Sequence, residues 1–130
     1  MILLDTHMWL WWVTNSPRLR PRDRELIETH LSDGLGVSEI SVWEIAKKHG
    51  LGKLGLNQPI DEWLETAMAY PGIQLLPLTL NVLIEATRLP GGFRSDPGDE
   101  IIVATSRVLV VPLLTADEKL LNYAHVTKLT

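Results

Sequence analysis

The chain has no cysteine, no excess of positive charge and no long apolar run, and each absence excludes a class of protein. Without cysteine there are no disulfides, no thiolate metal ligands and no cysteine nucleophile. The formal net charge of −4 argues against a non-specific nucleic-acid binder, which usually carries a basic balance. No apolar run approaches the ~20 residues that a membrane span needs. The first residues also lack the pattern of a signal peptide, so we expect a cytoplasmic protein with no membrane partner.

The length and composition are those of one compact domain covering residues 1–130. Of these residues, 45% are hydrophobic and 22% are charged. A chain of this size buries roughly two thirds of its unfolded surface on folding, so its core needs no metal or disulfide for stability.

Short apolar segments alternate with segments of helical periodicity, which predicts repeated βα units. The predicted strands are residues 1–4, 35–37, 73–76, 108–114 and 126–129. The predicted helices are residues 8–13, 21–32, 40–49, 60–67, 81–88, 97–105 and 118–123. Buried strands separated by helices favour a parallel sheet that is covered on both faces, which is a three-layer α/β/α domain.

Acidic residues follow two of the predicted strands. Asp5 comes directly after the first strand and Asp117 just after the fourth, where open parallel sheets bind their ligands. Glu44 and Asp99 lie near the starts of two helices, and Asp96 precedes Asp99 by three residues. We expect these side chains to meet at one edge of the sheet. Their mutual repulsion would require a cation, and hard oxygen ligands favour Mg²⁺ or Mn²⁺.

Most of these acids also have an ordinary structural alternative. Glu44 follows Ser41 at the spacing of a capping box, in which the carboxylate satisfies a backbone N–H group. The acids that have N-cap or helix-dipole roles as alternatives are Asp96, Asp99 and Asp117. Asp5 has no turn or cap role that the sequence makes obvious, so it gives the strongest functional indication.

Four segments carry a resemblance that spans nearly the whole chain: MILLDTHMWLWW, SVWEIAKKHGLGKL, SDPGDEIIVATSR and LLTADEKL. In this order and spacing they resemble the PIN-domain ribonucleases, specifically toxins of the VapBC type. The resemblance implies a parallel sheet of about five strands in the order 3-2-1-4-5. It also implies a catalytic and metal-binding set, which falls on Asp5, Glu44, Asp99 and Asp117.

The resemblance also assigns supporting roles and an activity. Asp96 becomes a fifth, outer acid. Thr115 becomes a hydroxyl that orients Asp117 or a metal-bound water molecule, and Thr6 takes a similar role. The implied activity is hydrolysis of RNA phosphodiester bonds at a Mg²⁺ or Mn²⁺ site, by an endoribonuclease toxin of a type II toxin–antitoxin system. The implied products carry a 5′-phosphate and a 3′-hydroxyl. The implied partners are the RNA substrate, a cognate VapB-type antitoxin and a second copy of the chain in a homodimer.

Two basic groups are candidate contacts to the RNA backbone. They consist of Arg18, Arg20, Arg22 and Arg24, and of Lys47, Lys48 and Lys53. The alternative is that each group is the solvated face of a helix. Three tryptophans beside the first strand, Trp9, Trp11 and Trp12, suit either a groove for a partner helix or ordinary core packing.

Two other classes of protein place acids at strand ends. A Mg²⁺-binding receiver domain of a signalling system requires a phosphorylatable aspartate after the third strand, where this chain has Leu78, Thr79 and Leu80. A PIN-like binding module that has lost hydrolysis is the second alternative. The complete four-acid set argues against that module.

Overall fold

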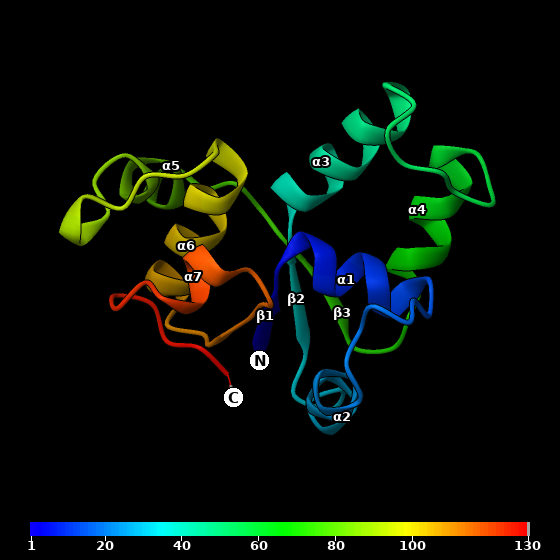
Figure 1. The fold of residues 1–130 in the computed structure, drawn as a ribbon, viewed down its shortest axis with the longest axis horizontal. Helices are drawn as coiled ribbons and strands as arrows, with labels where there is room; N and C mark the ends of the chain where they lie inside the picture. The colour runs from blue at the N-terminus through cyan, green and yellow to red at the C-terminus, as the bar shows by residue number, and fades with distance from the viewer. Residues whose placement is uncertain (130) are drawn as a thin grey trace.

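A four-stranded parallel sheet lies at the centre of the computed structural model, which describes residues 1–129 (Figure 1). Its strands are β1 (Ile2–Leu4), β2 (Leu35–Ser38), β3 (Ile73–Leu76) and β4 (Leu113–Leu114). The strand order is β3-β2-β1-β4, so the predicted order of the first four strands is confirmed. Strand β1 pairs with β2 on one side and with β4 on the other, and the chain reverses its direction of progress across the sheet between β1 and β4.

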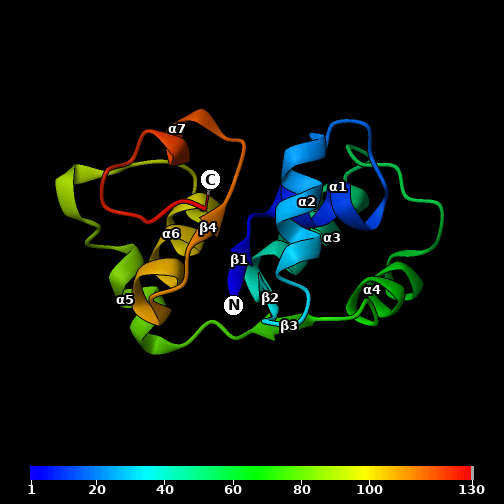
Figure 2. The same ribbon diagram turned by 90° about the horizontal axis from the view of Figure 1, so that it is seen from below.

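Helices cover both faces of this sheet. They are α1 (Thr6–Val13), α2 (Pro21–Thr29), α3 (Glu39–Gly50), α4 (Ile60–Met68), α5 (Leu80–Ala86), α6 (Pro97–Leu109) and α7 (Glu118–Leu121), with a short 3₁₀ turn at Pro90–Gly92. Figures 1 and 2 show α1, α2 and α4 on one side of β1, and α5, α6 and α7 on the other. None of the helices in residues 1–129 has the length and hydropathy of a membrane span.

The strand predicted over residues 108–114 is the main error in the expected elements. Helix α6 continues to Leu109 and ends where Val110 adopts a left-handed conformation with φ of 55°, leaving only Leu113–Leu114 as β4. Several β-branched residues suggested a strand, but their preference depends on context, and here the packing of α6 on the sheet prevails.

The predicted fifth strand is reduced to one bridge. Leu113 pairs in parallel with Lys128, and two backbone hydrogen bonds of 2.9 Å join Leu113 to Thr127 and Leu129. The C-terminal segment therefore lies beside β4, at the position expected for a fifth strand. The short β4 offers it little backbone to pair with.

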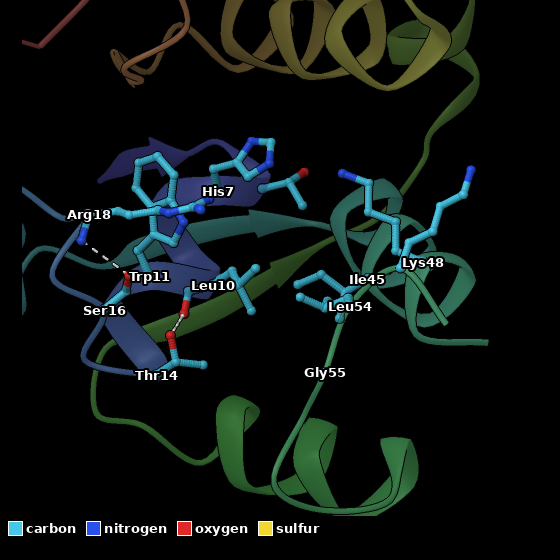
Figure 3. Close-up of a pocket in the computed structure, with 12 residues that line it drawn as sticks. His7, Leu10, Trp11, Thr14, Ser16, Arg18, Ile45, Lys48, Leu54 and Gly55 are labelled. Atoms are coloured by element: carbon cyan, nitrogen blue, oxygen red, sulfur yellow. Dashed lines mark hydrogen bonds between the residues drawn. The ribbon is translucent and has the colours of Figure 1, made fainter. Parts of the chain in front are cut away.

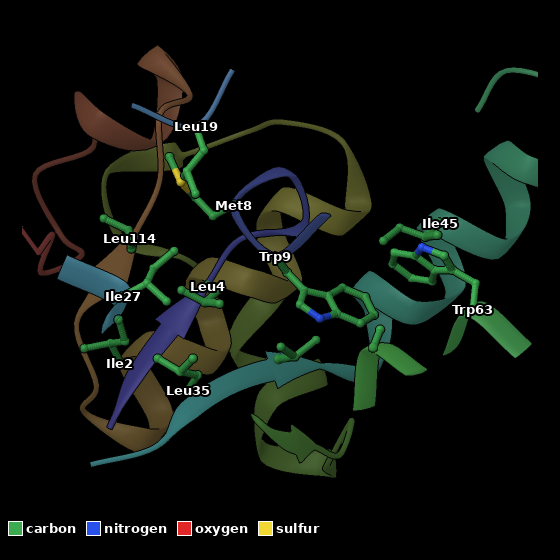
Figure 4. Packing of buried hydrophobic residues seen from close by; sticks show 12 residues of the cluster. Ile2, Leu4, Met8, Trp9, Leu19, Ile27, Leu35, Ile45, Trp63 and Leu114 are labelled. Carbon is green, nitrogen blue, oxygen red and sulfur yellow. The ribbon is translucent and has the colours of Figure 1, made fainter. Parts of the chain in front are cut away.

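The buried side chains form two clusters, one on each face of the sheet. Ile2 and Leu4 of β1 belong to the cluster beneath α1, α2 and α4, whereas Leu3 belongs to the cluster beneath α5 and α6. Figure 4 shows the first cluster around Trp9, whose ring centroid lies 5.5 Å from that of Trp63. Because β1 is buried on both faces, the residues that follow it have a fixed position at the edge of the sheet.

Candidate active site

The site lies at the carboxyl ends of β1 and β4. The chain adds β2 and β3 on one side of β1 and β4 on the other, so these two neighbouring strands form the switch point of the sheet. Asp5 follows β1 directly and is only 5% exposed. One of its carboxylate oxygens accepts a hydrogen bond of 2.8 Å from the backbone N–H of Met8, and the other accepts one from the hydroxyl of Thr115. The same Thr115 oxygen accepts a hydrogen bond of 3.0 Å from the backbone N–H of Asp117. This hydroxyl therefore links the acids that follow the two strands.

Asp5 has a structural role that the sequence did not reveal. It is the N-cap of α1, because the helix begins at Thr6 with no intervening loop. The helix predicted from Met8 begins two residues earlier, which is why the sequence pattern made no cap role for Asp5 obvious. A buried carboxylate that satisfies a helix N-terminus can also line a pocket with the rest of its surface, so the two roles are compatible.

The Glu44 carboxylate is held by a hydroxyl group of α1. The hydroxyl of Thr6 donates a hydrogen bond of 2.7 Å to Glu44 Oε1, and the hydroxyl of Ser41 lies 2.7 Å from the same Thr6 oxygen. The capping-box alternative for Ser41 and Glu44 is wrong, because α3 begins earlier and its N-cap is Ser38. The Glu44 carboxylate therefore does not cap the N-terminus of α3.

The start of α6 brings two more acids to the site. Asp96 is the N-cap of this helix and accepts a hydrogen bond of 2.9 Å from the backbone N–H of Asp99. The hydroxyl of Ser95 donates a hydrogen bond of 2.6 Å to Asp99 Oδ2. A Cβ atom on Gly98 would lie 2.5 Å from Glu44 Oε2, so the Glu44 carboxylate occupies its present position because this residue is glycine. Sequence reasoning missed the contributions of Ser95 and Gly98, although both lie in the SDPGDE segment.

All five predicted acids line one small pocket of about 90 Å³. Its complete lining is Asp5, Thr6, His7, Glu44, Lys48, Asp96, Asp99, Ile102 and Asp117. Asp117 is also the N-cap of α7, since it accepts a hydrogen bond of 2.8 Å from the backbone N–H of Lys119. The N-cap alternatives for Asp96 and Asp117 are thus confirmed. Capping does not keep these carboxylates out of the pocket.

The pocket raises the pKa values of its buried acids. Burial raises the pKa of Asp5 from 3.8 to about 6, against the lowering effect of the hydrogen bonds from Thr115 and Met8. Burial is also the main cause of the raised pKa values of Glu44 and Asp99, to which the nearby charge of Asp96 contributes. The ion pairs within residues 1–129 all involve other acids. No acid of the pocket is therefore in an ion pair within residues 1–129, although Lys48 also lines the pocket.

The chemistry of this donor set fits a hard divalent cation. Carboxylate oxygens are the ligands that Mg²⁺ and Mn²⁺ prefer, and a cation would relieve the repulsion that adds to the effect of burial on these pKa values. The acids line the pocket without yet enclosing a point between them, since no three His, Asp or Glu side chains of residues 1–129 are arranged to hold an ion as they stand. Asp5, Glu44, Asp99 and Asp117 are the residues that would hold one.

The members of the two predicted basic groups differ in what they contact. Arg20 is committed to an ion pair of 2.7 Å with the buried Asp23, and Lys47 lies 5.6 Å from the ring centroid of Trp43. Arg22 and Arg24 lie on α2 and line neither the acidic pocket nor the groove beside it.

The remaining basic residues gather beside the acids. Arg18, Lys48 and Lys53 line a groove between α1 and α3, and Lys48 also lines the acidic pocket (Figure 3). Trp11 faces this groove, whereas Trp9 is fully buried in the core. The three tryptophans thus differ in role, and core packing alone accounts for Trp9.

Solved structures share this fold over nearly the whole chain. VapBC2 from Rickettsia felis, bound to a DNA fragment of its promoter, matches with a TM-score of 0.73 and 14% identity over 99% of this chain and 98% of that chain. FitAcB from Neisseria gonorrhoeae matches with a TM-score of 0.68 and 22% identity over 100% and 97%. DNA-bound VapBC from Salmonella typhimurium matches with a TM-score of 0.72 and 16% identity over 99% and 98%. At these identities the likeness defines the fold class.

Sequence comparison defines the family. The PIN domain family model matches residues 2–126. Ribonuclease VapC22 of Mycobacterium tuberculosis is 31% identical over 124 residues, which are 95% of this chain and 92% of that protein. The chain therefore belongs to the PIN domain family and, within it, to the VapC-type proteins. The resemblance found in the four sequence segments is confirmed, as is the α/β fold that it implied.

The pKa of Asp5 predicts how stability depends on pH. Because folding raises this pKa from 3.8 to about 6, the folded protein binds more protons than the unfolded chain between these two values. The free energy of unfolding of the metal-free protein should fall as the pH rises through this window, by at most about 3 kcal/mol, and stay low above it. Asp5→Asn should abolish this part of the dependence. Urea denaturation in EDTA at a series of pH values measures the difference between variant and wild type.

The matched control is Asp61→Asn, since Asp61 is an exposed acid on α4 far along the chain from the pocket. Its stability curve should run parallel to that of the wild type. Parallel curves for Asp5→Asn as well would contradict the buried, destabilised state of the Asp5 carboxylate.

Proposed function

We propose that this protein is a divalent-metal-dependent endoribonuclease, the toxin of a type II toxin–antitoxin system. The proposal is carried by the meeting of five carboxylates in one pocket, none of them in an ion pair within residues 1–129. It is supported by the 31% identity to a protein named as a ribonuclease. In this proposal Asp5, Glu44, Asp99 and Asp117 are the catalytic and metal-binding residues, and Asp96 supports them.

A Mg²⁺ or Mn²⁺ ion bound by these acids would supply a Lewis acid that activates water and neutralises charge on the scissile phosphate. The chain's own hydroxyls set the directions of the carboxylates beforehand. Thr115 orients Asp5, Thr6 orients Glu44 and Ser95 orients Asp99. Hydrolysis by water leaves a 5′-phosphate and a 3′-hydroxyl and does not use the 2′-hydroxyl of the substrate.

The test is RNA cleavage by the purified toxin after removal of its antitoxin. A pool of structured cellular RNA is incubated with Mg²⁺, with Mn²⁺ or with EDTA, and the ends of the products are determined. Asp99→Asn should lower the cleavage rate at least about 100-fold, because it removes a metal ligand from an otherwise intact site. Its melting temperature should stay close to that of the wild type.

Asp61→Asn is again the control and should cleave like the wild type. Cleavage that persists in EDTA, or an Asp99→Asn variant as active as the wild type, would refute the metal-dependent mechanism. Tight Mn²⁺ binding without cleavage of any RNA would favour the alternative of a non-catalytic PIN-like binding module.

Gly98 provides a test that leaves every charge in place. Gly98→Ala introduces a Cβ atom that would lie 2.5 Å from Glu44 Oε2, so the carboxylate must move. Alanine is also a better helix former than glycine. We therefore expect a melting temperature at or above that of the wild type together with at least about tenfold slower cleavage.

Gly50→Ala is the matched control for this variant, because a Cβ atom at Gly50 meets nothing within 4 Å. It should leave cleavage unchanged. An active Gly98→Ala variant would show that the position of Glu44 does not matter for the reaction.

We further propose a VapB-type antitoxin as the partner. A solved structure with this fold is a toxin–antitoxin complex from Klebsiella pneumoniae, which matches with a TM-score of 0.67 and 15% identity. Excess negative charge in the acidic pocket would attract a basic side chain of the antitoxin. We expect a toxin with such a substrate and partner to act in the cytoplasm.

A homodimer is the last part of the proposal. Large apolar side chains are exposed on α5 and at the end of α6, where Leu80 is 81% exposed, Ile84 50% and Val110 87%. The two helices pack against each other. Exposed apolar patches mark interaction surfaces in soluble proteins, and a second copy of the chain is the occupant we propose.

Val110→Asp tests the homodimer. A valine at φ of 55° is strained, whereas aspartate tolerates this conformation, so the fold should not suffer. Light scattering after size exclusion should give a wild-type mass of twice 14.6 kDa and a mass of 14.6 kDa for a Leu80→Glu and Val110→Asp double variant. Leu51→Glu, at an exposed position beyond α3, should remain dimeric. A double variant that stays dimeric would exclude this face.

A further inference from the structure

A groove of about 480 Å³ lies between α1 and α3 and adjoins the acidic pocket. Figure 3 shows Trp11 and Arg18 on one side of it and Lys48 on the other, with Leu10 and Ile45 between them. Thr6, His7 and Lys48 line both the groove and the acidic pocket. A chain lying in the groove would therefore enter directly onto the carboxylates.

The α1 side of the groove carries an aromatic surface. His7 and Trp11 lie one helical turn apart, with ring centroids 5.5 Å apart and ring planes tilted by 38°. His7 is exposed and Trp11 is half-buried, packed against the core cluster. Aromatic rings held in place at a surface are the usual platform for unpaired bases, because every base has a face that can stack.

Three cations border the same groove. Arg18, Lys48 and Lys53 all line it, and none of them is in an ion pair within residues 1–129. By contrast, Arg20 and Arg107 have carboxylate partners at 2.7 and 2.8 Å. A protein with a formal net charge of −4 thus keeps three uncommitted cations around one groove. This charge is complementary to a phosphate backbone.

We infer that this groove binds the single-stranded RNA next to the scissile phosphate, with a base stacked on Trp11 and His7 and the flanking phosphates against Arg18, Lys48 and Lys53. The inference rests on the proposed function, which it deepens by naming the side chains of this chain that would hold the RNA strand beside the acids. A base can lie on the Trp11 ring only when it is unstacked from its neighbours, so paired RNA is excluded. Trp11 is then a specificity-determining residue, while the acids perform the hydrolysis.

The experiment measures binding in EDTA, where no metal-dependent cleavage occurs. The probes are fluorescein-labelled oligo(U) and oligo(A) RNAs of about ten nucleotides, with a duplex RNA of the same length for comparison. The variants are Trp11→Leu, which keeps an apolar side chain but removes the ring, and Trp11→Phe, which keeps a ring. Fluorescence anisotropy of the full-length protein, freed from antitoxin, gives the affinities.

Trp11→Leu should weaken binding of the single strands about tenfold, and Trp11→Phe less than about threefold. Lys53→Glu should weaken binding about as much as Trp11→Leu does. It should also reduce the dependence of the logarithm of the affinity on the logarithm of the salt concentration. The matched controls are Trp12→Leu and Lys47→Glu. Trp12 is also half-buried on α1 but packs on Tyr70, at 5.2 Å between centroids, and Lys47 lies over Trp43 outside the groove.

Several results would overturn the inference. They are equal affinities of Trp11→Leu and Trp12→Leu, a wild-type preference for the duplex, and no binding of any oligonucleotide at low salt. A Trp11→Leu variant that loses the antitoxin but keeps its RNA affinity would assign the groove to the antitoxin instead, which also overturns it.

The cleavage assay keeps this failure separate from failure of the proposed function. Ring-dependent RNA binding by a protein that cleaves nothing in Mg²⁺ or Mn²⁺ supports the groove and refutes the nuclease. If the protein cleaves RNA in a metal-dependent way but Trp11→Leu binds RNA as tightly as the wild type, the nuclease is supported and RNA binding in the groove is refuted.

Discussion

The site depends on one buried hydrogen bond, in which the hydroxyl of Thr115 donates to the carboxylate of Asp5. It joins the ends of β1 and β4, the two neighbouring strands at the switch point of the parallel sheet. Removing a carboxylate from water is unfavourable, and the pKa of about 6 for Asp5 reflects that cost. The metal-free fold therefore carries a destabilising group at its centre. A bound cation would remove this penalty, so metal binding and folding stability are coupled in the proposed enzyme.

The parts of the fold that could be predicted are those that follow from local apolar patterns. Residues 1–4 and 73–76 are short apolar runs between breakers, and both became strands of the predicted parallel sheet. That topology placed Asp5 and Asp117 at one edge without any knowledge of contacts. Val110 shows the limit, because its β-branched neighbourhood suggested a strand while packing extended α6 through Leu109. Roles that depend on partners distant in sequence, such as the space that Gly98 leaves for Glu44, have no local signal.

The net charge of −4 is a poor guide to what this molecule binds, because its charges are segregated. Acids concentrate in the pocket at the sheet edge, while Arg18, Lys48 and Lys53 surround the adjoining groove. The net charge adds the negative charges of the pocket to the positive charges of the groove, so it hides both regions. Lys48 lines both regions, and its charge partly offsets the rise in the pKa of Glu44 that burial causes. In the proposal the groove binds RNA and the adjoining pocket binds a divalent cation. The opposite charges of the two regions stabilise each other.

This adjacency constrains how an antitoxin could inhibit the proposed enzyme. The repulsion among the carboxylates can be relieved by a divalent ion or by a basic side chain, and a pocket of about 90 Å³ has little room for both. Because Thr6, His7 and Lys48 line the groove as well as the pocket, a partner that inserts a basic side chain also covers the entrance used by RNA. Inhibition would then displace metal and substrate in a single step, and neither site could be freed while the other stayed covered.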